Sequence, residues 1–77
     1  MDKIQKFVRK LSAGEARRVF DALEQVLTGR LSALSVKKLK GDRDIYRVRV
    51  GRVRIIFTKV HDQNIITDID FRNDHTY

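Results

Sequence analysis

The chain has 77 residues and a formal net charge of +7, which points to one small domain with a strongly basic surface. It contains no cysteine and two histidines, so we predict neither a disulfide nor a metal site, and we expect no cofactor. No apolar run approaches the roughly 20 residues that cross a bilayer, and no signal-peptide pattern opens the chain, so we expect a soluble cytoplasmic protein that does not bind membranes.

The first third of the chain has the pattern of two helices. Apolar residues recur at helical spacing over residues 2–11 and again over residues 13–28. Ser12 and Glu15 have the spacing of a capping box, which predicts that the second helix begins directly after Ser12. Gly29 stands where a glycine ends many helices. Because so short a connection favours a helical hairpin, we expect both apolar stripes to lie in the core.

The second half of the chain has the pattern of strands. Residues 30–36 are interpreted as a linker. Three strands are predicted after it, over residues 45–50, 52–60 and 65–72. Gly51 marks the first turn and residues 61–64 mark the second, and such short connections favour an antiparallel meander. The sequence therefore predicts a single α+β domain over residues 1–77, with the helical hairpin packed on a three-stranded sheet.

Strict alternation divides the side chains of the predicted strands between two faces. Arg47 and Arg49 lie on the face away from the helices, and Arg54 joins them from the second strand. In the third strand, the residues expected on the core side are Ile65, Thr67, Ile69 and Phe71. Their neighbours on the outer side are Ile66, Asp68, Asp70 and Arg72. The sequence therefore predicts four arginines on one exposed face, with two aspartates beside them.

The positive charge is concentrated in the middle of the chain. Residues 37–59 contain nine Lys or Arg and two Asp or Glu. Guanidinium groups on paired strands are held rigidly, and they match phosphate groups in charge and in the geometry of their hydrogen bonds. We therefore expect a polyanion, nucleic acid first of all, as the ligand of this face. A solvated basic surface that serves solubility is the alternative.

Three segments together resemble the RelE/ParE toxin superfamily of bacterial and archaeal toxin–antitoxin systems. They read LKG at 39–41, DIYRVRVGRVRIIF at 44–57, and IIxxIxFRNDHTY from 65 to the last residue. The resemblance implies the same α+β fold. RelE-type members are endoribonucleases that cleave mRNA in the ribosomal A site without a metal ion, and ParE-type members inhibit DNA gyrase by binding. A catalytically inactive relative that binds nucleic acid is a third possibility.

The resemblance also assigns roles to residues. Arg54 and Arg72 match the positions of a phosphate clamp in the catalytic site. Tyr77 matches a terminal aromatic that stacks on a base or orients the 2′-hydroxyl. His75 is a candidate for proton transfer because its ordinary pKa is near neutrality, and an exposed tail histidine without a role is the alternative. The positions that match RNA-binding residues are Lys40, Arg47 and Arg49.

The partners that the resemblance implies are a cognate antitoxin, mRNA and the ribosome. DNA is expected only indirectly, through a complex with the antitoxin, and gyrase only if the chain is ParE-like. An acidic or amphipathic antitoxin segment would wrap the sheet and the helices. The candidate contacts for this segment are Lys3, Lys6, Arg9, Lys10, Arg17 and Arg18. For most of them, the alternative is a solvated helix face.

Two features depart from the family pattern. Family members begin with a strand before the first helix, whereas this chain starts almost directly at the helix. The absence of that strand would leave one sheet edge unpaired. Three explanations are open: the sheet is smaller, a strand from a partner completes it, or the sequence is truncated. The second departure is at Gly51, Arg52 and Val53. Family members have an aromatic residue here, just before the arginine that Arg54 matches, and this chain has an additional charge instead.

Overall fold

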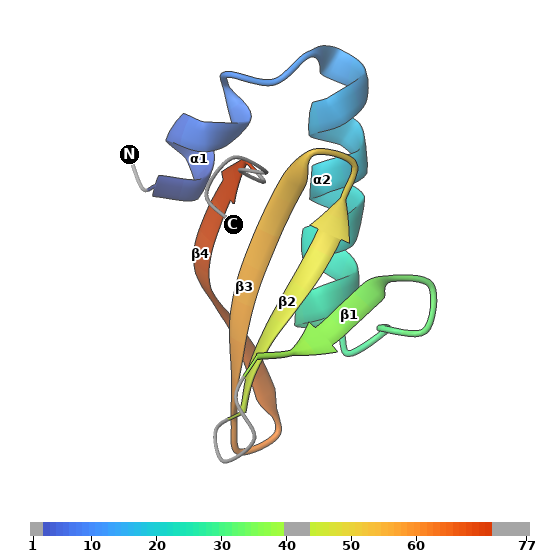
Figure 1. The fold of residues 1–77 in the computed structure, drawn as a ribbon, viewed down its shortest axis with the longest axis vertical. Coiled ribbons are helices and arrows are strands. Elements are labelled where there is room, and N and C mark those ends of the chain that lie inside the picture. The colour runs from blue at the N-terminus through green and yellow to red at the C-terminus, as the bar shows by residue number, and fades with distance from the viewer. Residues whose placement is uncertain (1–2, 40–43, 72–77) are drawn as a thin grey trace.

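Two helices and a four-stranded antiparallel sheet form the domain in a computed structural model, which describes residues 3–39 and 44–71 (Figure 1). The helices are α1 (Lys3–Val8) and α2 (Ala13–Leu27). The strands are β1 (Ser35–Lys38), β2 (Ile45–Val50), β3 (Val53–Val60) and β4 (Gln63–Phe71). Neighbours in the sheet follow chain order, so the predicted α+β meander is confirmed. The long helix α2 lies behind the strands, and α1 lies beside β4 (Figure 1).

Local signals set the ends of α2. The Ser12 side chain accepts a hydrogen bond from the N–H of Glu15, and the Glu15 carboxylate accepts one from the N–H of Ser12, so the predicted capping box is present. At the other end, Gly29 has a φ of 78°. Its N–H donates to the carbonyl of Val26, and the next N–H, from Arg30, donates to Gln25. This is a Schellman motif, and it explains why the helix ends before Gly29.

The first helix is shorter than predicted, because α1 ends at Val8 rather than at residue 11. The N–H of Lys10 donates to the carbonyl of Phe7, and the N–H of Leu11 donates to that of Val8. Such i to i+3 bonds tighten the end of a helix. The backbone is then extended at Ser12, which has φ −64° and ψ 163°.

The strand β1 lies where the sequence analysis placed part of a linker, so the prediction of three strands is wrong by one. Val36 of β1 pairs with Val48 of β2 and packs against the core. The other three residues of β1 are exposed, so alternation within the strand has only one apolar residue to mark it. Pairing with β2 therefore defines this strand more than its own composition does.

The last strand departs from strict alternation. The turn between β3 and β4 needs only His61 and Asp62, so β4 begins at residue 63 rather than 65. Farther along, Asp68 pairs with Ile56 and Ile66 pairs with Phe57. Thr67 is therefore the extra residue of a β-bulge, which reverses the faces of the residues before it.

The bulge corrects the predicted core. Ile66 packs against the core, whereas Ile65 has 46% of its surface exposed, the reverse of the expected assignment. Beyond the bulge, Ile69 is fully buried, as the alternation predicts. The buried centre joins both helices to three strands and consists of Phe7, Val8, Val19, Ala22, Leu23, Val26, Val48, Val53, Ile55, Phe57 and Ile69.

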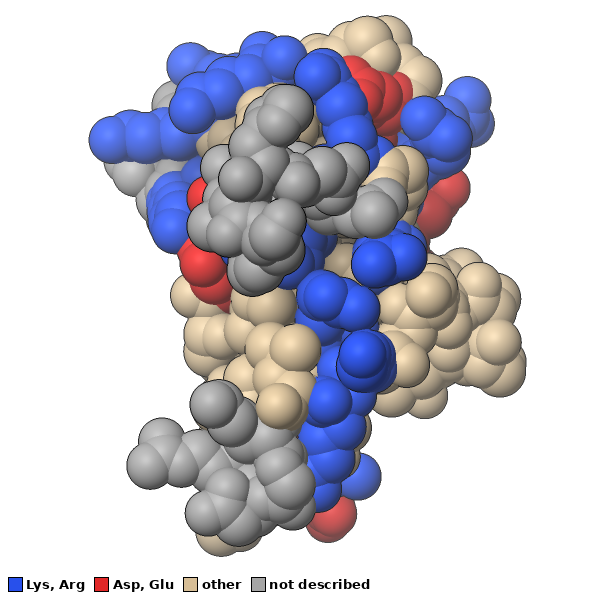
Figure 2. Space-filling model, viewed as in Figure 1, with Lys and Arg blue, Asp and Glu red and all other residues tan. Residues whose placement is uncertain are grey.

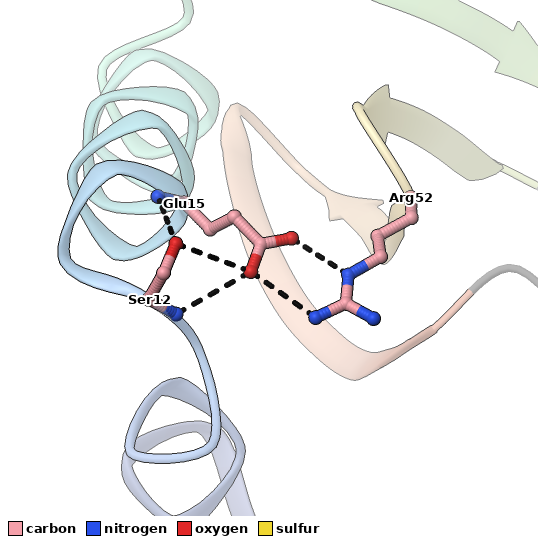
Figure 3. A network of polar contacts seen from close by, with 3 residues as sticks. All are labelled: Ser12, Glu15 and Arg52. Atoms are coloured by element: carbon pink, nitrogen blue, oxygen red, sulfur yellow. Dashed lines mark hydrogen bonds and ion pairs between the residues drawn. The ribbon is translucent and has the colours of Figure 1, made fainter.

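Arg52 connects the turn between β2 and β3 to the start of α2 (Figure 3). Its Nε and a terminal nitrogen donate to the two carboxylate oxygens of Glu15, at 2.7 and 3.2 Å. The guanidinium carbon also lies 4.6 Å from the centre of the Phe71 ring. The same carboxylate accepts a hydrogen bond from the N–H of Ser12, so one acidic group both caps α2 and links it to the sheet. The positive charge of Arg52 therefore has a structural role, because it is paired with Glu15.

The hydrogen bond from Arg52, followed by that from the N–H of Ser12, lowers the pKa of Glu15 from 4.5 to about 2. Because this pKa is lower in the folded protein, the carboxylate stabilises the fold above pH 4.5, and this contribution is lost as the pH falls through about 2. We expect Glu15→Gln to lower the melting temperature at neutral pH. The difference in melting temperature between this variant and the parent should shrink as the pH is lowered from 4.5 to about 2. Circular dichroism during heating measures it.

Glu24→Gln is the matched control for Glu15→Gln, because Glu24 is also on α2 but is exposed and outside this network. Its melting temperature should follow that of the parent at every pH. Equal melting temperatures for Glu15→Gln and the parent at neutral pH would show that the network does not stabilise the fold.

A pair of alanine variants tests the bulge. Ile66→Ala removes a side chain packed against the core and should cost about 2 kcal/mol of unfolding free energy. Ile65→Ala removes an exposed side chain and should cost about 1 kcal/mol or less, largely through lost strand propensity. Urea unfolding of both variants measures the difference. The opposite ranking would mean that β4 alternates without a bulge.

Candidate nucleic-acid interface

Three arginines lie on the face of the sheet away from the helices. The residues between and beside them, Val48, Val53 and Ile55, are at most 1% exposed and point into the core. Arg47, Arg49 and Arg54 must therefore point the other way, because successive side chains of a strand alternate. Arg49 is exposed, and the other two are half-buried. Their contact with RNA stays a prediction.

The pairing of the strands brings these arginines close together. Arg49 of β2 is directly opposite Arg54 of β3, and such partners have Cβ atoms about 5 Å apart. Arg47 is opposite Ile56 on one side and Lys37 of β1 on the other. We call Lys37, Arg47, Arg49 and Arg54 the basic face. Figure 2 shows Lys and Arg side chains in a column that runs down this side of the molecule.

Lys37 is the one residue of the basic face that the sequence analysis did not assign to the site. It was missed because residues 30–36 were interpreted as a linker and no strand was predicted before residue 45. The available signal is Val36, whose neighbour on a strand must point to the opposite face. Once β1 is paired with β2, Lys37 extends the row of cations by one strand.

The fourth strand borders the basic face with carboxylates. Asp70 is opposite Arg54, and Asp68 is opposite Ile56. Asp68 forms an ion pair with Lys3 of α1. The hydrogen bond from Lys3 lowers the pKa of Asp68, and the charge of Arg54 adds to this shift. A phosphate backbone is therefore attracted by β1 to β3 and repelled by these two carboxylates of β4.

The two aspartates also bind the main chain of their own strand. Asp68 accepts a hydrogen bond from the N–H of Ile69 at 2.9 Å, and Asp70 accepts one from Phe71 at 2.8 Å. Both side chains are thereby held in place beside the basic face. Asp70 thus places negative charge between Arg54 and α1, so an anionic ligand that reaches from one to the other must pass it.

The basic face can bind a phosphate and stabilise additional negative charge on it. A guanidinium group donates hydrogen bonds and accepts none, so the arginines of this face can stabilise negative charge but another group must accept the proton. The residues predicted to complete the site, namely Lys40, Arg72, His75 and Tyr77, lie outside the described residues. Within residues 3–39 and 44–71, no group of three or more His, Cys, Asp or Glu could hold a metal ion. In the same ranges, neither helix is long and apolar enough to span a membrane.

Comparisons of the chain with protein-family models, with curated proteins and with solved structures found no match.

Two like charges directly opposite each other should cost stability, so we expect Arg49→Thr to stabilise the fold. The gain in unfolding free energy should be about 0.5 kcal/mol at low ionic strength and should shrink as salt screens the charges. The same variant should bind single-stranded RNA more weakly. Chemical denaturation and fluorescence anisotropy measure the two effects.

Lys59→Thr is the matched control, because Lys59 is an exposed strand residue outside the basic face and the charge change is the same. Its affinity for RNA should stay close to that of the parent. If both variants lose affinity equally, net charge alone determines binding and the basic face has no special role.

Proposed function

We propose that this chain is a RelE-like toxin that cleaves mRNA on the ribosome without a metal ion. The observation that carries the proposal is the common exposed face of Arg47, Arg49 and Arg54 on two paired strands. Its support from the sequence is the resemblance of residues 44–57 and of the C-terminal segment to that family.

The proposed reaction is an attack of a ribose 2′-oxygen on the adjacent phosphorus. The 2′-hydroxyl loses its proton, a bond forms from this oxygen to phosphorus, and the bond from phosphorus to the 5′-oxygen breaks. The leaving 5′-oxygen takes up a proton, and the products are a 2′,3′-cyclic phosphate and a free 5′-hydroxyl. Such a site needs cations around the phosphate and groups that transfer protons.

In this proposal, the basic face supplies cations for that reaction. Arg54, together with Arg72, stabilises the charge that develops on the phosphate oxygens. His75 transfers a proton, and Tyr77 orients the 2′-hydroxyl or stacks on a base. Arg47 and Arg49, with Lys40, hold the neighbouring phosphates. The ribosome positions the mRNA, which allows a small site with few proton carriers to be effective.

The same face explains how such a toxin would be held inactive. An acidic segment of a cognate antitoxin that covers the basic face would neutralise it and exclude RNA. Charge complementarity with a toxin of net charge +7 would also accelerate the encounter.

The test is induced expression of the parent, Arg54→Ala and Arg72→Ala, with mapping of the new mRNA ends. We expect ribosome-dependent cleavage by the parent and a loss of about 10²- to 10³-fold in rate for each variant, because a preorganised group that stabilises transition-state charge is removed. Arg54→Lys keeps the charge but not the paired donors, and it should recover only part of the rate. Melting temperatures confirm that the variants fold.

Arg30→Ala is the control, since it removes a positive charge from an exposed residue beyond α2, outside the basic face. It should cleave as the parent does. A gyrase supercoiling assay with the same proteins covers the ParE-like alternative. Inhibition of gyrase without new mRNA ends would contradict the proposed nuclease and favour that alternative.

A further inference from the structure

A shallow depression of about 360 Å³ lies between α1 and β4. The residues that line it are Lys3, Lys6, Phe7, Lys10, Ile69 and Asp70. Three of these carry ammonium groups, and they come from the same short helix and the turn after it. The depression is thus a concave, positively charged surface outside the basic face.

The charge of this depression has few internal partners. Residues 3–14 contain four Lys or Arg and no Asp or Glu. Lys3 is bound by Asp68, but within residues 3–39 and 44–71 the ammonium groups of Lys6 and Lys10 form no ion pair. Lys6 and Lys10 are four residues apart and face the same hollow. Among the described residues, these two cations therefore have no carboxylate partner.

The depression adjoins the basic face. Asp70 forms part of its wall, and Asp70 is the direct partner of Arg54 in the sheet. Figure 2 shows Lys and Arg side chains both in the column down the sheet and at the upper left of the molecule, where Figure 1 places α1. An extended anion bound at Arg54 therefore has a second group of cations within reach, on the far side of Asp70.

We propose that Lys6 and Lys10 bind phosphate groups of the RNA strand whose neighbouring phosphates lie on the basic face. This inference rests on the proposed function, since it extends the RNA contact of that site onto α1. The occupant is single-stranded RNA, because its regularly spaced phosphates can span both groups of cations. The contacts in the depression extend the bound RNA beyond the phosphate at which it is cut.

The contacts in the depression are with phosphates rather than bases. Among the described residues that line it, the aromatic ring is that of Phe7, which is only 5% exposed and packs against Phe71 with ring centres 4.7 Å apart. No face of this ring is open for a base to stack on. Ammonium groups bind phosphate as point charges without reading sequence. Binding at Lys6 and Lys10 is therefore independent of base identity.

The test compares the full chain with Lys6→Ala/Lys10→Ala in binding to a labelled twelve-nucleotide oligouridylate over a range of salt concentrations. Each phosphate contact with a single strand contributes about 0.7 to the slope of log affinity against log salt concentration. Loss of both contacts should therefore reduce the slope by roughly 1.4. An oligoadenylate of the same length should show the same reduction.

Arg30→Ala/Lys59→Ala is the matched control, because it removes the same charge from two exposed residues outside the depression and the basic face. Its slope should equal that of the parent. Equal slopes for Lys6→Ala/Lys10→Ala and the parent, or equal reductions in both double variants, would overturn the proposal. So would a loss of affinity for polyglutamate without a loss for RNA, which would identify a surface for an acidic protein segment.

This binding assay uses neither ribosomes nor cleavage, so its outcome is separate from that of the nuclease test. If no mRNA is cut but the slope falls as expected, the phosphate contacts stand and the nuclease function fails. If mRNA is cut and the slope is unchanged, the nuclease stands and the contacts on α1 fail.

Discussion

The structure depends on the antiparallel pairing of β2 with β3. This pairing sets Val48 against Ile55, both fully buried, and at the same time sets Arg49 against Arg54 on the opposite side. A shift of one residue would bury the arginines and expose the core, so the same register specifies both the stable side and the charged side of the sheet. The two-residue turn at Gly51, whose φ is 58°, fixes that register.

The cations of this small domain serve two different purposes. Arg52 and Lys3 are held by carboxylates and connect the helices to the sheet. Arg49 instead lies opposite another arginine, an arrangement that costs stability and suits an external anion. A sequence with a net charge of +7 thus separates its structural ion pairs from the charge that it presents to a ligand.

The fold could be predicted where its signals are local. The capping box at Ser12, the glycine after α2 and the alternation in β2 each depend on residues near one another in the chain. The strand β1 could not, because it has one apolar residue and is defined by pairing with β2. The bulge at Thr67 could not either, since an extra residue in one strand is apparent only against its partner.

In the candidate site, too, the residues marked by local patterns could be predicted and those that depend on strand pairing could not. Alternation was sufficient to place Arg47, Arg49 and Arg54 together, because all three lie on strands with clear apolar neighbours. Lys37 required the pairing of β1 and was missed. The depression beside α1 joins residues about 60 positions apart, such as Lys10 and Asp70, and no short pattern in the sequence brings them together.

The aspartates of β4 have a consequence for how the protein behaves at high concentration. β4 is the last strand of the sheet, and main-chain groups on such a strand can recruit a strand from another molecule. The N–H groups of Ile69 and Phe71 already donate to Asp68 and Asp70. A second molecule approaching there meets N–H groups that are already occupied, so these carboxylates make this stretch of the edge a poor template for an added strand.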